Sequence, residues 1–323
     1  MNLHLITGGA GFVAVNLARQ LLNEGHAILA LDDLSRGKRE LLAEFDKHPR
    51  FTFQHIDCAD SDAMASAVDD VGAQIDHVWH LAANSDIPAG LADPRIDRDR
   101  TFQTTFAVLE VMRRYAIPEL HFASSSAIYG DLGDREIHED IGPLLPISNY
   151  GAMKLASEAQ IRAAVEAFLP RADIFRFPNV IGVPATHGVI VDFVRKLKAT
   201  PDRLEVLGDG TQQKAYLHVD DLVNAMLHVS RLPGRHKVFN IGPKDVGVSV
   251  RKIAELVRDR VSPNANIVFG EGNRGWIGDV PRFRYSTQRL TDTGWAPKLS
   301  SIEAVSRAID QIASEELRNW SRP

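Results

Sequence analysis

A tyrosine and a lysine at helical spacing are the first sign of chemistry in this sequence. Tyr150 and Lys154 stand four residues apart, so on a helix their side chains lie on one face, one turn apart. A phenol is a poor base at neutral pH. A nearby positive charge stabilises the phenolate and brings the pKa toward the working range. A surface helix with an aromatic residue and a cation shows the same spacing, so the pair needs supporting residues.

A run of three serines supplies candidates for a third member of this centre. Ser124, Ser125 and Ser126 follow the short apolar run at 119–123. Open α/β sheets place their chemistry at the carboxyl ends of the strands. A serine there can hydrogen-bond a substrate hydroxyl and relay its proton.

A glycine-rich turn near the start of the chain predicts a dinucleotide site. Gly8 and Gly11 lie between an apolar run at 3–7 and a helical pattern at 12–23. Glycines there let the backbone turn tightly and approach a pyrophosphate at the helix N-terminus. Glycine turns close many strands without binding a nucleotide, so the context matters. Here Asp32 ends the next apolar run, where a carboxylate can accept hydrogen bonds from the adenosine ribose.

The carboxylate of Asp32 favours NAD over NADP, because it would repel a phosphate on that ribose. Three cations follow it, Arg36, Lys38 and Arg39, and they leave NADP open at this point.

The elements that must position these residues follow an alternating pattern. Parallel strands joined by right-handed helical crossovers are the expected result. The sequence predicts strands at 3–7, 27–31, 51–55, 77–81, 119–123 and 172–175, and helices at about 12–23, 101–115 and 150–168. The fold class is therefore α/β, a doubly wound parallel sheet of the Rossmann type with a smaller C-terminal lobe. We expect residues 1–178 to form the nucleotide-binding domain, with 217–240 returning to it, and 179–323 to form mainly the smaller lobe.

Composition excludes several classes of function. The 323 residues carry a formal net charge of −5, so neither nucleic acid nor an anionic membrane is an expected partner. Cys58 is the only cysteine, which rules out an internal disulfide. The twelve histidines show no metal-binding spacing, and no metal is expected. No apolar run approaches the length of a membrane span, and the expected location is the cytoplasm.

Taken in order, the motifs resemble the extended short-chain dehydrogenase/reductase family, in its nucleotide-sugar epimerase and dehydratase branch. The resemblance begins at Thr-Gly-x-x-Gly in 7–11 and continues through His-Leu-Ala-Ala at 80–83, the serine run and Tyr-x-x-x-Lys. It then covers Arg-Phe-Pro-Asn at 176–179, Gly-Asp-Gly-Thr at 208–211 and Gly-Trp-Ile-Gly-Asp at 275–279. It implies an NAD-dependent enzyme and identifies Ser125 as the catalytic serine, beside Tyr150 and Lys154.

The same resemblance implies a set of cofactor contacts along the first half of the chain. In it, Asp57 meets the adenine amine and Lys154 also holds the nicotinamide ribose. The implied NAD-binding residues are Gly8, Gly11, Phe12, Val13, Asp32, Asp57, Cys58, Leu81, Ala82, Ala83, Tyr150, Lys154 and Pro178.

The residues after the catalytic serine bear on the type of reaction. In this family, 4,6-dehydratases carry an Asp-Glu pair there, whereas this chain has Ser126 and Ala127. The remaining groups suffice for C4 epimerisation through a 4-keto intermediate, as in the UDP-galactose 4-epimerases. The alternatives are a 4-keto nucleotide-sugar reductase, a dehydratase or epimerase acting on another nucleotide sugar, and, outside enzymes, a non-catalytic NAD-sensing protein.

The resemblance also implies the groups that meet a nucleotide sugar. Asn179 corresponds to a pyrophosphate contact and Tyr216 lies near the nucleobase. The chain departs from the galactose epimerases at Lys214, where they have arginine, and at Ser85, where they have a phosphate-binding lysine. The implied substrate-binding residues are Ser85, Ser125, Ser126, Asn179, Val189, Lys214, Tyr216, Arg274 and Arg282, with one of the two arginines contacting phosphate.

A homodimer is the expected assembly. In the family, two helices corresponding to 101–115 and 150–168 form a four-helix interface. Both segments carry apolar residues on more than one face, Phe106 and Leu155 among them.

Overall fold

The computed structural model describes residues 1–133, 135–272 and 284–320. The chain divides into two compact units. Unit 1 comprises residues 1–130, 142–177 and 226–239, and unit 2 comprises residues 131–141, 178–225 and 240–323. The division runs through helix α8 (Val219–Ser230), whose last residues belong to unit 1.

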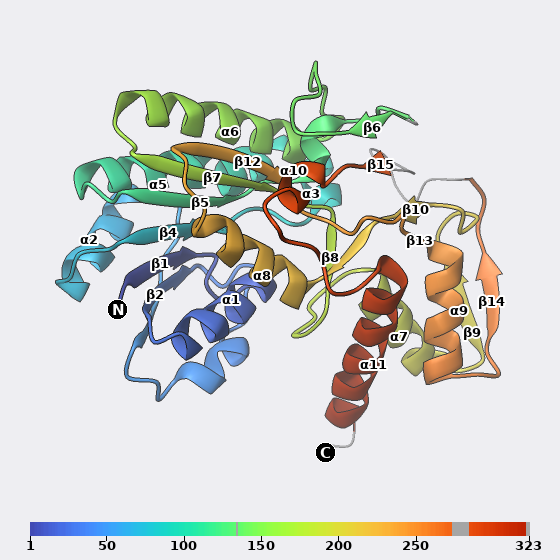
Figure 1. Ribbon diagram of the computed structural model, residues 1–323. Helices are drawn as coiled ribbons and strands as arrows, with labels where there is room; N and C mark the ends of the chain where they lie inside the picture. The colour runs from blue at the N-terminus through green and yellow to red at the C-terminus, as the bar shows by residue number, and fades with distance from the viewer. Residues whose placement is uncertain (134, 273–283, 321–323) are drawn as a thin grey trace. The chain divides into compact units, whose positions relative to one another are not determined.

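Unit 1 is built on a seven-stranded sheet, shown in Figure 1. The strands lie in the order β3 (Phe51–His55), β2 (Ala27–Asp32), β1 (Leu3–Thr7), β4 (His77–His80), β5 (Glu119–Ala123), β7 (Arg171–Arg176) and β12 (His236–Asn240). Every pairing from β3 to β7 is parallel. The order reverses between β1 and β4, as in a doubly wound sheet. This confirms the predicted Rossmann-type fold class.

Helices cover both faces of this sheet. One core cluster joins the strands to α2 (Ser61–Val71), α5 (Gln103–Arg114) and α6 (Asn149–Ala167), while α1 (Phe12–Asn23) packs beside β2. Figure 1 shows α2, α5 and α6 along one face. The sequence did not predict α2, whose N-terminus is capped by Asp60. Short helices complete the unit: η1 (Arg39–Phe45), α3 (Ile87–Ala92), α4 (Pro94–Asp97), η2 (Arg98–Phe102) and η3 (Ser126–Tyr129).

The helix expected at about 101–115 is regular only from Gln103. Its first turn is replaced by η2, which has π-helical geometry over 98–102. Thr101, which the pattern placed at the helix start, lies in η2 and is fully buried. Its hydroxyl accepts a hydrogen bond from the Asn84 backbone nitrogen at 3.1 Å, which ties η2 to the segment after β4.

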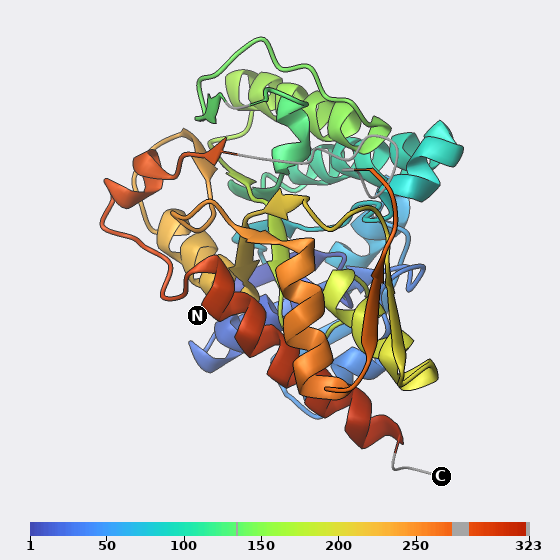
Figure 2. The ribbon, with the colours of Figure 1, turned by 90° about the vertical axis from the view of Figure 1, so that its right-hand side faces the viewer.

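Unit 2 packs short strand pairs against three long helices. Its main core cluster draws on α7 (Val189–Ala199), α9 (Val250–Val261) and α11 (Ser301–Trp320), and Figure 2 shows α9 and α11 side by side. The strand pairs are β8 (Asn179–Ile181) with β11 (Tyr216–His218), β9 (Arg203–Val206) with β14 (Asn266–Phe269), β10 (Gln213–Lys214) with β13 (Val248–Ser249), and β6 (Glu136–Ile137) with β15 (Arg284–Tyr285). The short helix α10 (Gln288–Thr291) follows β15. None of the helices in the described part of the chain combines the length and the apolar character needed to cross a membrane.

Candidate active site

The glycine turn joins the end of β1 to the start of α1. Gly8 has φ +68°, and a Cβ atom there would lie 2.8 Å from the Ala82 backbone nitrogen. Gly11 is the N-cap of α1, and no side chain caps this helix end. The turn therefore lets a ligand come close to its backbone and leaves the N-terminus of α1 without a side-chain cap. This arrangement binds a pyrophosphate.

Asp32 closes β2 beside this turn and is 6% exposed. One carboxylate oxygen accepts a hydrogen bond from the Ala10 nitrogen at 3.0 Å, and the other accepts one from the Leu34 nitrogen at 2.7 Å. Burial raises the pKa of this carboxyl above its usual value, while the two backbone N–H groups oppose the rise. The carboxylate is held rigidly at the turn, with further lone pairs for a ribose hydroxyl.

Arg36 and Arg39, the two arginines that could favour NADP, form ion pairs with other residues. Arg36 forms an ion pair with Asp86 at 2.9 Å, and Arg39 pairs with Asp46 at 2.6 Å. Both pairs are solvent-exposed. Together with the fixed carboxylate of Asp32, they favour a ribose without a phosphate.

The other predicted NAD contacts in unit 1 cluster around the carboxyl ends of β1, β3 and β4. The Leu81 nitrogen donates to the Thr7 carbonyl at 3.2 Å, and the Ala82 nitrogen donates to the Thr7 hydroxyl at 3.3 Å. Ala83 is half-buried and Ser85 is exposed. These positions line the same strand ends as Gly8. Phe12 and Val13, also half-buried, form the first turn of α1.

Asp57 and Cys58 follow β3 and differ in environment. Asp57 is exposed and accepts a hydrogen bond from the Ala59 nitrogen at 2.9 Å. Cys58 is buried, with its sulfur 3.8 Å from the Leu31 carbonyl oxygen. Burial raises the pKa of its thiol to about 12, so the thiol is not a base at neutral pH.

The structure brings Ser125, Tyr150 and Lys154 together in unit 1. Ser125 is the second residue after β5. It accepts a hydrogen bond from the Ala127 nitrogen at 3.1 Å and is hydrogen-bonded to the Tyr150 hydroxyl. Ser148 caps α6 by accepting from the Gly151 nitrogen at 3.1 Å, which sets the first helical turn and Tyr150 within it. Lys154, one turn later, donates to the Ala123 carbonyl at 2.6 Å.

The two titratable members of this centre have shifted pKa values. Burial raises the pKa of the Tyr150 hydroxyl to about 12, and Asp97 adds to the rise while the hydrogen bond from Ser125 opposes it. Burial lowers the pKa of Lys154 to about 7, with Glu158 opposing the shift. The ammonium lies 4.6 Å from the Phe122 ring centroid and 5.9 Å from that of Tyr150. Acid–base groups with strongly shifted pKa values that lie close together are typical of catalytic centres.

Sequence reasoning missed the charged network beneath this centre. Glu158 continues the face of α6 one turn beyond Lys154, and Arg176 holds it with a bidentate pair of 3.0 and 2.6 Å. Arg176 also donates to the Tyr129 hydroxyl at 3.0 Å, and the Ser124 hydroxyl donates to Glu158. The network fixes α6 against β5 and β7. Its one signal in the sequence was that Glu158 follows Lys154 at the same four-residue spacing that separates Lys154 from Tyr150.

Asp97 was also missed, because it reaches the centre from a separate short helix. Its side chain is fully buried, and one oxygen accepts a hydrogen bond from Asn84 at 2.8 Å. Its other oxygen has no hydrogen-bond partner among the described residues. Ser126, predicted to contact substrate, is buried, and its nitrogen donates to the Phe177 carbonyl at 3.1 Å.

The remaining predicted contacts belong to unit 2. Asn179 and Tyr216 are register partners in the β8–β11 pair, where Asn179 is exposed and Tyr216 is buried. Lys214 lies in β10 opposite Val248. Pro178 and Val189 are half-buried, immediately before β8 and at the start of α7. Arg274 and Arg282 lie outside the described residues.

Known proteins match this chain over nearly its whole length. A UDP-glucose 4-epimerase of Corynebacterium glutamicum is 30% identical over 327 residues, covering 93% of this chain and 92% of that protein. The crystal structure of a UDP-galactose 4-epimerase superposes with a TM-score of 0.83 at 31% identity, covering 97% of this chain and 99% of that one. The UDP-glucose 4-epimerase of Thermus thermophilus, in complex with NAD, gives a TM-score of 0.83 at 28% identity, with 96% and 98% covered.

A family model leads to the same group of proteins. The model described as the NAD dependent epimerase/dehydratase family matches residues 4–242. That range contains the glycine turn, Asp32 and the centre of Ser125, Tyr150 and Lys154. The chain therefore belongs to the NAD-dependent epimerase/dehydratase family and uses NAD as its cofactor.

Proposed function

We propose that this chain is a nucleotide-sugar 4-epimerase that acts on a UDP-sugar. The observation that carries the proposal is the hydrogen-bonded pair of Ser125 and Tyr150, with Lys154 on the same helix face. The similar proteins named above, a UDP-glucose and a UDP-galactose 4-epimerase, support this choice within the family. Neither residue after Ser125 is a carboxylate, since Ser126 and Ala127 stand there. Elimination of water therefore lacks the acid and base that a dehydratase has at these positions.

Tyr150 is the group that exchanges a proton with the 4-hydroxyl of the sugar. Its side chain is half-buried, and Ser125 shares a hydrogen bond with its hydroxyl, so both can meet one substrate hydroxyl. When bound, NAD supplies the hydride acceptor and donor for reversible oxidation at carbon 4, through a 4-keto sugar, and its oxidised ring is positively charged. Tyr150 returns the proton when the 4-hydroxyl is formed again.

The shifted pKa of Tyr150 indicates when this base becomes active. At a pKa of about 12 the phenol keeps its proton at neutral pH. A positive charge brought close to a buried phenol stabilises the phenolate and lowers that pKa. Lys154 contributes such a charge when it is protonated. The tyrosine is therefore poised to act as a base only when the complete site is assembled.

Residues of unit 2 are proposed to hold the nucleotide part of the substrate. Asn179 and Tyr216 are register partners in β8 and β11, and Asn179, the exposed one of the two, is the one whose position supports a direct contact. Lys214 offers a point charge to phosphate rather than the fork of an arginine. Ser85, Val189 and one of Arg274 and Arg282 complete the proposed set. The proposed domain roles follow: residues 1–178 with 217–240 for NAD, and mainly 179–323 for the nucleotide sugar.

A panel of UDP-, dTDP-, GDP- and CDP-sugars, incubated without added cofactor and resolved by NMR, tests this function. The expected result is interconversion of C4 epimers of a UDP-sugar, with NAD absorbance in the purified protein. If the purified protein contains no bound nucleotide and converts the sugar only when NADPH is added, the enzyme is a reductase. This outcome would overturn the proposal.

Replacement of Tyr150 by phenylalanine tests the catalytic centre. Loss of the proton-transferring hydroxyl is expected to lower kcat by about 10²–10⁴-fold, while binding of the nucleotide sugar, measured by calorimetry, remains. Tyr115→Phe is the matched control, because it removes a hydroxyl that is bonded to Asp69 on the surface. An unchanged rate in Tyr150→Phe contradicts the proposed centre.

We further propose that the enzyme is a homodimer that works in the cytoplasm. The dimer is expected through α5 and α6, as implied by the family. Among the apolar residues that suggested this interface, Phe106 is 39% exposed, whereas Leu109, Val111, Ile161 and Val165 face the core of unit 1. Cell fractionation tests the location.

A further inference from the structure

Polar side chains also gather at the opposite end of the sheet from the active site. His77 is the first residue of β4, Glu119 is the first residue of β5, and the two are register partners. His121 lies two residues along β5, so its side chain is on the same face as that of Glu119. Three metal-binding side chains are thus placed together by two neighbouring strands.

The spacing of their ligand atoms suits a tetrahedral ion. His77 Nδ1 lies 3.2 Å from His121 Nε2 and 3.3 Å from Glu119 Oε2, and the last two atoms are 3.8 Å apart. With Zn–N and Zn–O bonds near 2.0–2.1 Å, ligand atoms at tetrahedral angles lie about 3.3 Å apart. The three atoms therefore approximate one face of a zinc tetrahedron.

The neighbours of these side chains set which ring nitrogens carry protons. Asn2 Nδ2 lies 3.1 Å from His77 Nε2, and an amide that donates there leaves the His77 proton on Nδ1. Binding of an ion at His77 Nδ1 therefore requires that this proton leaves and that the Asn2 amide turns its oxygen to Nε2. Asp173 accepts a hydrogen bond from His121 Nδ1 at 3.0 Å. A carboxylate only accepts here, so the proton is on Nδ1 and Nε2 presents its lone pair to His77 and Glu119. Glu119 Oε2 is buried and has no hydrogen-bond partner among the described residues, although it forms an ion pair with Arg171 at 3.3 Å. A carboxylate that orients a histidine in this way is the usual second layer of a metal site.

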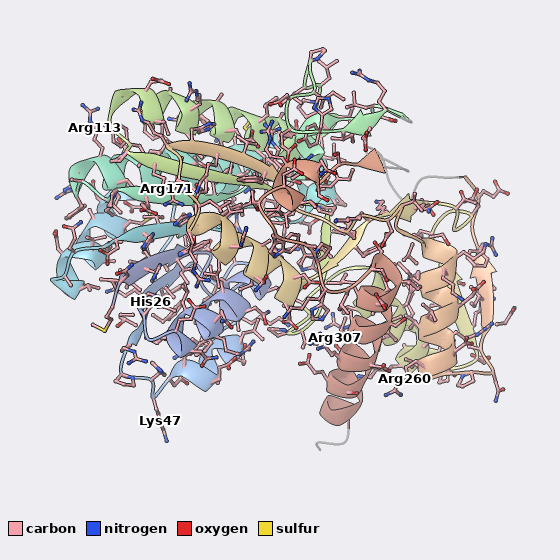
Figure 3. All side chains as sticks on the ribbon, viewed as in Figure 1. His26, Lys47, Arg113, Arg171, Arg260 and Arg307 are labelled. Atoms are coloured by element: carbon pink, nitrogen blue, oxygen red, sulfur yellow. The ribbon has the colours of Figure 1, made fainter. Side chains whose placement is uncertain are left out.

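The charge around the cluster leaves room for a cation. Asp76 acts electrostatically on His77, and Glu119 and Asp173 are the other carboxylates here. Arg171 and Lys237 are the cations that pair with them. Arg171, labelled in Figure 3, lies 3.3 Å from Glu119 Oε2 and also pairs with Asp173 at 3.1 Å. Glu119 together with the described neighbours thus carries three negative and two positive charges, a net charge of −1. A divalent ion would share the Glu119 carboxylate with Arg171. The ion pair between Arg171 and Asp173 would remain.

We propose that this cluster binds one Zn²⁺ ion through His77 Nδ1, Glu119 Oε2 and His121 Nε2, with a water molecule in the fourth position. Two imidazoles and one carboxylate select a transition metal over Mg²⁺ or Ca²⁺, which prefer oxygen ligands. His121 is fully buried, but the side chains of His77 and Glu119 are 17% and 25% exposed, so solvent and the ion can reach them. The ion would cross-link β4 and β5 at their amino ends.

Metal titration of the tag-free, chelator-treated, full-length chain tests this site. Competition with a chromophoric chelator is expected to show one Zn²⁺ per chain, and Co²⁺ in its place is expected to give the visible bands of a four-coordinate ion. Crystals soaked with Zn²⁺ are expected to show anomalous scattering between the three side chains. A wild-type chain without saturable binding, or with a six-coordinate Co²⁺ spectrum, overturns the proposal.

Matched variants separate this site from adventitious histidine binding. Glu119→Gln keeps the shape of the side chain but removes the anionic ligand, and His77→Gln removes the more exposed imidazole. Each is expected to weaken Zn²⁺ binding by at least about tenfold, whereas His138→Gln, at an exposed histidine in unit 2, leaves it unchanged. Circular dichroism and NAD retention establish that each variant is folded. Equal affinity in folded Glu119→Gln and wild type is the second result that overturns the site.

Discussion

Lys154 combines two demands that conflict within one side chain. In the proposed mechanism its ammonium supports a phenolate at Tyr150, yet the side chain is 1% exposed and burial lowers its pKa to about 7. A buried charge is stabilised only by what surrounds it, here the Ala123 carbonyl, the Phe122 ring and Glu158. The centre is therefore expected to gain activity at the expense of stability.

The pH dependence of unfolding tests this cost. The pKa of Lys154 is lower in the folded chain, about 7, than its ordinary value of 10.5. Between these values the unfolded chain holds one more proton, so the free energy of unfolding rises with pH. Relative to Lys154→Met, the wild-type chain should gain up to about 1.4 kcal/mol per pH unit from pH 7 to about 10. Denaturant unfolding at several pH values measures the difference, and a flat difference contradicts the lowered pKa.

At the scale of elements, the start of α6 is the part on which the proposed catalysis depends most directly. Tyr150 is the second residue of this helix, and Ser148 supplies the cap that fixes its first turn. A frayed first turn would move the phenol away from Ser125. The proposed mechanism thus couples helix capping and proton transfer at one helix end.

Replacement of Ser148 by alanine is expected to lower the free energy of unfolding by about 1 kcal/mol, the usual value of such a cap. It is also expected to reduce kcat several-fold while Tyr150 remains present. Ser300→Ala is the control, because Ser300 forms a capping pair with Glu303 at the start of α11, which carries no proposed catalytic residue. Steady-state kinetics and denaturant unfolding of both variants check this. An equal loss of kcat in the two variants argues against a positioning role for Ser148.

The sequence was sufficient for features that depend on local spacing. Each of these features lies within one short stretch of chain, so pattern and structure agree. They are the glycine turn between β1 and α1, Asp32 at the end of β2, and the Tyr150–Lys154 pair on α6. Charged contacts between distant segments could not be predicted in this way. Arg176 reaches Glu158 from another strand, and Asp97 reaches the centre from a short helix with little hydrophobic pattern.

The cluster of His77, Glu119 and His121 is a clearer example of contacts that local spacing does not predict. His77 and Glu119 become neighbours only through the register of β4 against β5, which no local pattern determines. Side chains that meet only through strand register are far apart in the sequence, so they lack the short spacing of a metal-binding motif. Strand register, rather than motif spacing, brings these ligands together.

At the scale of the whole molecule, the proposed dimer rests on a small exposed apolar area. Phe106 on α5 is 39% exposed, and charge there would be costly in an interface. Phe106→Glu is expected to raise the dimer dissociation constant by about 30-fold or more, as for a central interface residue. Analytical ultracentrifugation measures this constant.

Ile302→Glu is the matched control for the dimer, because Ile302 is equally exposed, at 39%, on α11 of unit 2. It is expected to leave the dissociation constant unchanged. Dissociation by both variants, or by neither, is evidence against an interface on α5.

The position of β12 has a consequence for how the chain is made on the ribosome. β12 (His236–Asn240) lies at one edge of the sheet beside β7 (Arg171–Arg176), although residues 178–225, which belong to unit 2, lie between them in the chain. During synthesis, the outer edge of β7 thus remains unpaired until the chain has been made as far as Asn240. Unpaired strand edges are templates for pairing with other chains. Slow translation between β7 and β12 would prolong that exposure, so the yield of native protein should depend on codon choice in this interval.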